Sequence, residues 1–183
     1  MSRFRMPLSI LLLMAACLPR LALGQADEGA AAAPRKPVVK SDAEWRKLLT
    51  RDQYYVTRMK GTEPAWTSPY VSDHRAGVFH CVGCGSPLFS SRTKFDSGTG
   101  WPSFYQPIAR GAIVTEADFS TGEQRVEVEC AVCHAHLGHV FADGPPPTGL
   151  RYCMNGVALK LIPTKATAKA ASKPAARKPA VAK

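Results

Sequence analysis

Five cysteines beyond residue 80 are the side chains of this sequence best suited to chemistry, and four of them occur in two pairs. Cys81 and Cys84 form one Cys-x-x-Cys motif, and Cys130 and Cys133 form the other. Each motif makes a tight turn that directs two thiolates at one ion and leaves backbone amides free to donate hydrogen bonds to sulfur. Together they predict a closed site of four thiolates, the usual structural site for one zinc ion, with no open position for a substrate.

The same four cysteines have other interpretations. They could form two disulfides if the chain is exported, one pair could be a redox-active dithiol, or four thiolates could bind iron. The presence of two such motifs favours zinc. The motifs are farther apart in the sequence than those of a compact zinc ribbon, so the fold must bring them together, each on its own hairpin. Metal binding and folding would then be one event.

Cys153 has no partner cysteine in the region that can fold, and an unpaired thiol in an exported protein is a candidate for reactivity. Arg151 lies two residues before it, and positive charge stabilises a thiolate. His136 and His139 lie three apart in a glycine-containing turn and could supply acid and base groups to a thiol nucleophile. The alternative is that Cys153 is an inert small hydrophobic residue in a strand. Trp101, between Gly100 and Pro102, offers an apolar wall.

The first 24 residues have the pattern of a secretory signal peptide. Two early arginines precede an apolar run over 7–18, and small residues allow cleavage after Gly24. The run is shorter than the roughly 20 apolar residues that cross a membrane. This pattern predicts export, most simply to a bacterial periplasm. The residues before Cys17 also resemble a lipoprotein box, so a lipid anchor through Cys17 is the alternative.

The two flanks of the predicted domain are low in complexity. Residues 163–183 consist mainly of Ala, Lys and Pro and predict a disordered tail, and 25–40 predicts a linker. Six cations lie in the tail and three in the signal, so a net charge of +10 for the whole chain leaves +1 for the rest. The basic composition therefore gives no reason to expect a specific nucleic-acid site, although the tail could contact anionic surfaces. One domain is expected over 41–162.

The order of local patterns predicts two short helices followed by a mainly antiparallel β domain stapled by the four-cysteine zinc site. Ser41 with Glu44, and Thr50 with Gln53, form capping boxes that begin the helices, the second ending near Gly61. Short runs rich in β-branched and aromatic residues then predict strands. These runs are 77–80, 87–89, 112–115, 125–129, 139–141 and 152–161. The strict alternation over 125–129 predicts one buried and one solvent-exposed face.

Three further segments, together with the two cysteine motifs, resemble a known family. They are Lys94–Phe104 (KFDSGTGWPSF), His134–Phe141 (HAHLGHVF) and Arg151–Asn155 (RYCMN). In this order, from about Thr50 to Leu161, they are similar to the B-type methionine sulfoxide reductases, the enzyme class that reduces the R epimer of methionine sulfoxide.

The resemblance implies a role for each matched residue. Cys153 would attack the sulfoxide sulfur and become a sulfenic acid, while His136 and His139 position or donate the proton that the oxygen needs. Such proton transfer is typically worth about 10²–10⁴-fold in rate. Asn155 would orient the site. The residues implied to contact substrate are Trp101, which receives the terminal methyl group, Phe104 and Arg151.

Two positions depart from the family pattern. Many members have a cysteine where this chain has Thr99, and that cysteine converts the sulfenic acid to an internal disulfide. This chain is therefore expected to depend on an external thiol, either a thioredoxin-like protein or a small thiol. The family usually has serine or threonine where this chain has Gly156, which removes one hydroxyl near the site.

Two other functions are compatible with parts of the pattern. One is a zinc-stabilised β binding module whose tail contacts nucleic acid or an envelope polymer, which the near-neutral domain and the export signal disfavour. The other is a thiol peroxidase or general oxidoreductase that uses the same Cys153.

Overall fold

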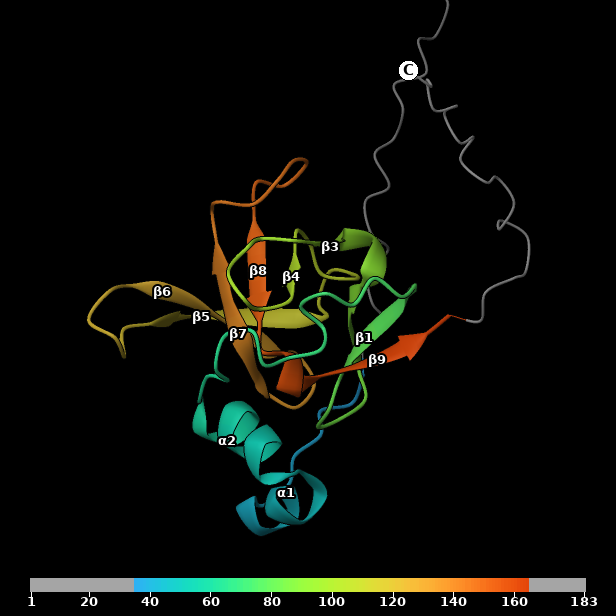
Figure 1. Ribbon diagram of the computed structural model, residues 1–183. Helices are drawn as coiled ribbons and strands as arrows, with labels where there is room; N and C mark the ends of the chain where they lie inside the picture. Colours follow the sequence, from blue (N-terminus) through green and yellow to red (C-terminus); the bar gives the residue numbers. More distant parts are fainter. Residues whose placement is uncertain (1–34, 165–183) are drawn as a thin grey trace, which may run out of the picture.

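The computed structural model describes residues 35–164, which form two helices and two antiparallel sheets (Figure 1). The predicted signal peptide, most of the predicted linker and nearly all of the predicted tail lie outside the described residues. No helix among residues 35–164 is long and apolar enough to cross a membrane. The elements are α1 Asp42–Leu48, α2 Arg51–Met59, β1 Gly77–Cys81, β2 Pro87–Ser90, η1 Ser91–Thr93, β3 Lys94–Phe95, β4 Ser103–Phe104, β5 Ile113–Asp118, β6 Arg125–Cys130, β7 His136–Phe141, β8 Arg151–Met154, η2 Gly156–Ala158 and β9 Leu159–Pro163.

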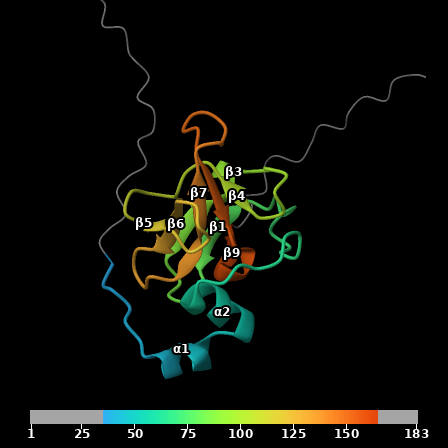
Figure 2. The same ribbon diagram turned by 90° about the vertical axis from the view of Figure 1, so that its left-hand side faces the viewer.

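The two helices begin where the capping boxes predict. The Ser41 side chain accepts a hydrogen bond from the Glu44 amide, and the Glu44 carboxylate accepts one in return from the Ser41 amide. Thr50 and Gln53 repeat this exchange at the start of α2. Both views place the helices together at one end of the β domain (Figure 1, Figure 2).

The strands form one sheet in the order β2-β1-β9 and a second in the order β3-β4-β8-β7-β6-β5. All paired strands are antiparallel, which confirms the predicted fold class. The run predicted over 152–161 is not one strand, because η2 interrupts it and sends β8 and β9 to different sheets. The two-residue strands β3 and β4 were not predicted, since two residues are too few to show a period.

Three phenylalanine rings pack together in the core. Phe89 stacks on Phe104 with ring centroids 4.6 Å apart, and Phe79 meets Phe104 edge-on at 5.0 Å. All three are fully buried. Such offset and edge-on pairs contribute about 0.5–1.5 kcal/mol each beyond the area they bury. This core fixes β4, and through β4 the position of its neighbour β8.

The alternation predicted for β6 is wrong. Val126 is 40% exposed, whereas Glu127 and Glu129 are buried. Both buried carboxylates are paired with an exposed lysine, because Lys60 Nζ lies 2.8 Å from Glu127 and 3.3 Å from Glu129. Charged residues are buried almost only when they are paired. The face of β6 that was expected to contact water instead carries buried carboxylates with ion-pair partners.

Candidate active site and metal centre

The four paired cysteines converge on one point. Their sulfur atoms all lie within 4.8 Å of one another. The Cys81 and Cys133 sulfurs are 3.6 Å apart, and those of Cys84 and Cys130 are 3.5 Å apart. Zinc–sulfur bonds of about 2.3 Å in a tetrahedron require sulfur–sulfur edges of about 3.8 Å, so the cluster has the size and donor set of a tetrathiolate zinc site.

Each half of the cluster comes from one hairpin, as predicted. One pair lies at the β1–β2 turn and the other at the β6–β7 turn, and these hairpins belong to different sheets. The turns share one geometry, since the Gly85 amide donates to the Cys81 carbonyl and the His134 amide to the Cys130 carbonyl, each at 2.9 Å. Gly85 and His134 both have positive φ angles, of 72° and 52°. A bound ion would therefore join the two sheets.

Cys153 lies in the middle of the second sheet, between two strands that carry polar side chains. Ser103 of β4 and His139 of β7 are its direct antiparallel partners (Figure 1). Residues paired in this way have Cβ atoms about 4.5–5.5 Å apart on one face of the sheet. The Thr99 hydroxyl is 3.7 Å from the Cys153 sulfur. The strand register therefore places the cysteine and an imidazole side by side.

A cavity of about 160 Å³ is bounded by Cys153. Its other walls include Trp101, His139, Phe141, Arg125 and Asn155. β7 approaches β8 closely here because Gly138 has no side chain, and a Cβ at this position would collide with the Cys153 carbonyl. The cavity has the size of a small side chain. Its lining combines aromatic rings with hydrogen-bond donors, one of them the cationic Arg125.

His136 is held by a buried carboxylate. Its Nδ1 donates to Glu127 Oε1 at 2.6 Å, and its Nε2 is buried without a partner. Burial lowers the pKa of His136, while the hydrogen bond to Glu127 opposes that shift. Burial also acts to raise the pKa of Glu127, but hydrogen bonds from Lys60 and His136 outweigh it, so that this pKa is lowered. Glu127 stays ionised and fixes the tautomer of the imidazole.

His139 has a carboxylate partner of its own. Its Nε2 donates to Asp118 Oδ2 at 2.8 Å, and Arg125 donates to the same oxygen at 2.6 Å. Hydrogen bonds from Ser120, followed by the one from His139, hold the pKa of Asp118 well below its usual range. The ring centroids of His136 and His139 are 5.5 Å apart. His139 thus lies beside Cys153, whereas His136 does not line the Cys153 cavity and lies next to His139; each imidazole is paired with an ionised carboxylate.

Comparison with known proteins agrees with this geometry. The SelR domain matches residues 49–163. A protein named peptide methionine sulfoxide reductase MsrB, from Pseudomonas putida, is 55% identical over 128 residues, which cover 70% of this chain and 98% of that protein. The chain belongs to the B-type methionine sulfoxide reductase family.

Plant members of the MsrB family are similar as well. The chloroplastic peptide methionine sulfoxide reductase B1 of Oryza sativa is 59% identical over 126 residues, covering 68% of this chain and 58% of the plant protein. The protein of the same name from Arabidopsis thaliana is 60% identical over 122 residues, covering 66% and 60%. The region that the SelR domain matches, 49–163, contains both the cysteine cluster and Cys153.

Two further residues expected at the MsrB site, Trp101 and Asn155, line the Cys153 cavity. Trp101 lines the cavity, and its indole nitrogen donates to the Glu63 carbonyl at 3.1 Å. Asn155 is buried, donates to the Leu137 carbonyl at 3.1 Å and accepts from the Glu63 amide at 2.9 Å. Its side chain therefore links Leu137 of β7 to the segment that carries Glu63, and its orienting role stays a prediction.

Arg151 and Phe104 do not line the Cys153 cavity. Arg151 makes two hydrogen bonds of 2.8 Å to Asp143 and lies over the Phe141 ring at 4.4 Å. Hydrogen bonds to Asp143 raise the pKa of Arg151, and the Cys153 side chain contributes in the same direction. Phe104 is a core residue stacked on Phe89, and its full burial leaves no surface for a substrate. Arg151 is thus beside Cys153, whereas Phe104 acts only through packing.

Four residues of the site were missed from the sequence: Glu63, Asp118, Arg125 and Glu127. Glu127 had a usable signal, since acidic residues in a strand directly before a histidine-rich strand can pair with it in an antiparallel hairpin. Asp118 and Arg125 face each other across the β5–β6 hairpin in the same way. Glu63 had no such signal, because it reaches the site from a segment without regular structure.

Proposed function

We propose that this chain reduces the R epimer of protein-bound methionine sulfoxide to methionine. The observation that carries the proposal is the placement of the Cys153 thiol directly opposite His139, beside a small cavity walled by Trp101. The names of the similar proteins support the same activity. The cavity could receive the methyl end of an oxidised methionine side chain against the indole.

The reaction transfers one oxygen atom. The Cys153 thiolate attacks the sulfoxide sulfur and forms a sulfur–sulfur bond while the oxygen takes up a proton. The sulfur–oxygen bond then breaks, the hydroxyl is transferred to the Cys153 sulfur, and the sulfur–sulfur bond breaks, which leaves methionine and a Cys153 sulfenic acid. Methionine sulfoxide is thereby reduced by two electrons and the cysteine is oxidised by two. His136 and His139 are the groups that supply and hold the proton, because each imidazole is kept in a defined orientation by Glu127 or Asp118.

An external thiol completes the cycle. Among residues 35–164, the cysteines other than Cys153 all belong to the four-sulfur cluster. Thr99 occupies the nearby position from which a second thiol could attack. A dithiol reductant, either a thioredoxin-like protein or a small thiol pair, would therefore attack the sulfenic acid, release water and leave as a disulfide.

The cluster of Cys81, Cys84, Cys130 and Cys133 is proposed to hold one zinc ion. Zinc bound there would supply structural cross-linking and no open coordination position. We also propose that the chain is exported, on the strength of the signal-like pattern over 1–24, and that it repairs oxidised envelope proteins in a periplasm. The alternative is a lipid anchor at Cys17, and the mass of the mature chain distinguishes the two.

The activity is tested by supplying a peptide that contains either the R or the S epimer of methionine sulfoxide, with dithiothreitol as reductant. We expect reduction of the R epimer only. Equal reduction of both epimers, or turnover of hydrogen peroxide with neither sulfoxide reduced, would contradict the proposal, and the second result would favour the thiol peroxidase.

Replacing Glu127 with glutamine is expected to lower kcat by about 10²-fold, at the low end of the range for loss of a proton donor. The carboxylate supports protonation of His136, so its removal lowers the pKa of the imidazole further. Less of the protonated form then exists at a given pH, and the pH of maximal kcat moves downward. Steady-state rates across pH measure both effects.

Glu129→Gln is the matched control for this change. Glu129 shares Lys60 with Glu127 and pairs with His134; it lies opposite His136 in the β6–β7 ladder, but the His136 ring bonds to Glu127 and not to the Glu129 carboxylate. A fall in kcat of similar size in both variants would assign the effect to the Lys60 network and would count against His136 as the proton donor.

Replacing Thr99 with cysteine is expected to introduce an intramolecular disulfide with Cys153 during turnover. The hydroxyl that the new sulfur would replace already lies 3.7 Å from the Cys153 sulfur. Attack on the sulfenic acid at that range forms the disulfide and releases water. Intact mass after one turnover, compared with Thr99→Ser, measures it, and an unchanged sulfenic acid in the cysteine variant would show that the geometry is unsuitable.

A further inference from the structure

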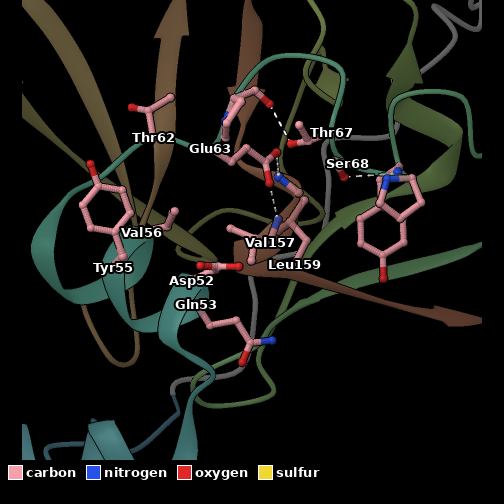
Figure 3. Close-up of a pocket in the computed structure, with 14 residues that line it drawn as sticks. Asp52, Gln53, Tyr55, Val56, Thr62, Glu63, Thr67, Ser68, Val157 and Leu159 are labelled. Carbon is pink, nitrogen blue, oxygen red and sulfur yellow. Dashed lines mark hydrogen bonds between the residues drawn. The ribbon is translucent and has the colours of Figure 1, made fainter.

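Glu63 forms part of the wall of a second cavity, of about 730 Å³, between α2, the segment 62–70 and η2 (Figure 3). Cys153 does not line this cavity. The Glu63 carboxylate accepts hydrogen bonds from the Gly156 amide at 2.5 Å and the Val157 amide at 2.9 Å, and Figure 3 shows it directed toward Val157. Its hydrogen-bonding capacity is thus used inside the protein.

The backbone of the same residue touches two residues of the Cys153 site. The Glu63 amide donates to Asn155 Oδ1 at 2.9 Å, and the Glu63 carbonyl accepts from the Trp101 indole at 3.1 Å. Both partners line the cavity beside Cys153. Glu63 therefore links η2, Asn155 and Trp101 through four hydrogen bonds.

Asn155 has an unusual role at the start of η2. Asparagine at an N-cap position normally accepts from an amide of the helix that it begins. Here Asn155 makes no such bond, because Glu63 accepts from the Gly156 and Val157 amides instead. The Asn155 side chain is left free to span the Leu137 carbonyl and the Glu63 amide.

The packing around Gly156 holds Glu63 at this short range. A Cβ on Gly156 would collide with the Ser68 side chain and approach Glu63 Oε1 to 3.3 Å. The segment 62–70 is therefore seated directly against the backbone of η2. This contact gives a physical reason for glycine where the family pattern has serine or threonine.

We propose that Glu63 is a positioning residue for sulfoxide reduction, and that it acts by capping η2 in place of Asn155. This inference rests on the proposed activity of Cys153. With the carboxylate present, Asn155 and Trp101 are held beside the nucleophile. Without it, Asn155 can turn to cap η2 itself, and the bonds that orient the cavity wall are lost.

The test compares Glu63→Gln and Glu63→Ala with Asp52→Asn, a control that removes a carboxylate lining the same 730 Å³ cavity on α2. Glu63→Ala is expected to lower kcat/KM by about 10²-fold, the size of effect that misplacement by about 1 Å produces. Most of the loss should fall on kcat. Glutamine retains one acceptor oxygen and should recover part of the loss, while the control stays within about twofold of the parent.

A double-variant cycle with Asn155→Ala distinguishes positioning from a general loss of structure. If Glu63 acts through Asn155, the double variant should be no more than about threefold slower than Asn155→Ala alone. The inference would be overturned if the losses in kcat/KM from Glu63→Ala and Asn155→Ala multiply in the double variant. It would also be overturned if the Glu63→Gln and Glu63→Ala variants are as active as the parent. A parent protein inactive on both sulfoxide epimers would instead overturn the proposed function, so the two failures can be told apart.

Discussion

Replacing Cys153 with serine is expected to abolish methionine sulfoxide reduction, with a loss in kcat of about 10⁴-fold or more. A hydroxyl is a far weaker nucleophile than a thiolate, and it cannot form the sulfenic acid that carries the oxygen away from the substrate. Side chains that only orient the substrate cannot compensate, because in the proposed reaction the two electrons come from this sulfur. Steady-state reduction of an R-sulfoxide peptide measures the effect.

The same variant should fold normally. Serine is smaller than cysteine and lies beside the polar side chains of Thr99 and Ser103. Cys153→Ser should therefore unfold within a few degrees of the parent and should bind substrate peptide. Activity retained by a correctly folded Cys153→Ser protein would exclude Cys153 as the nucleophile and would leave a binding function as the better account of the domain.

Loss of the metal is expected to have the largest effect on stability. Structural zinc sites contribute about 10–16 kcal/mol of apparent binding free energy in zinc-finger peptides, which equals or exceeds the 5–15 kcal/mol by which whole domains are stable. The cluster joins hairpins from two different sheets. Cys130→Ser, or a strong chelator, should therefore leave a protein that is largely unfolded at 37 °C by circular dichroism.

Cys153→Ser is the control for this experiment, because it removes a cysteine outside the cluster. It should retain one zinc per chain by elemental analysis, whereas Cys130→Ser should retain little. Parent protein that contains no metal, resists the chelator and shows two disulfides by intact mass would contradict the zinc assignment. It would establish the disulfide interpretation of the two Cys-x-x-Cys motifs.

Features that depend on short spacings were predictable from the sequence. The capping boxes at Ser41 and Thr50 begin α1 and α2, and the two cysteine motifs lie in hairpin turns. Each needs only three or four consecutive residues, whose geometry is set locally. The pairing of His139 with Cys153 was not predictable from spacing, because register is decided by the whole sheet.

The carboxylates that pair with the two histidines were not predicted from the sequence. Glu127 alternates with apolar neighbours, so it was expected to face water, but it is buried and pairs with the exposed Lys60 and the buried His136. Both partners come from other elements. Phe104 is the opposite case, since its place in a motif suggested a substrate contact and its neighbours Phe79 and Phe89 make it part of the core.

Trapping the oxidised enzyme tests the central claim most directly. The parent protein is mixed with one equivalent of R-sulfoxide peptide without reductant, treated with dimedone, and analysed by intact mass and peptide mapping. We expect one methionine formed per chain and one dimedone adduct, on Cys153. Recovery of Cys153 in an intramolecular disulfide, or methionine formed with Cys153 still reduced, would contradict it.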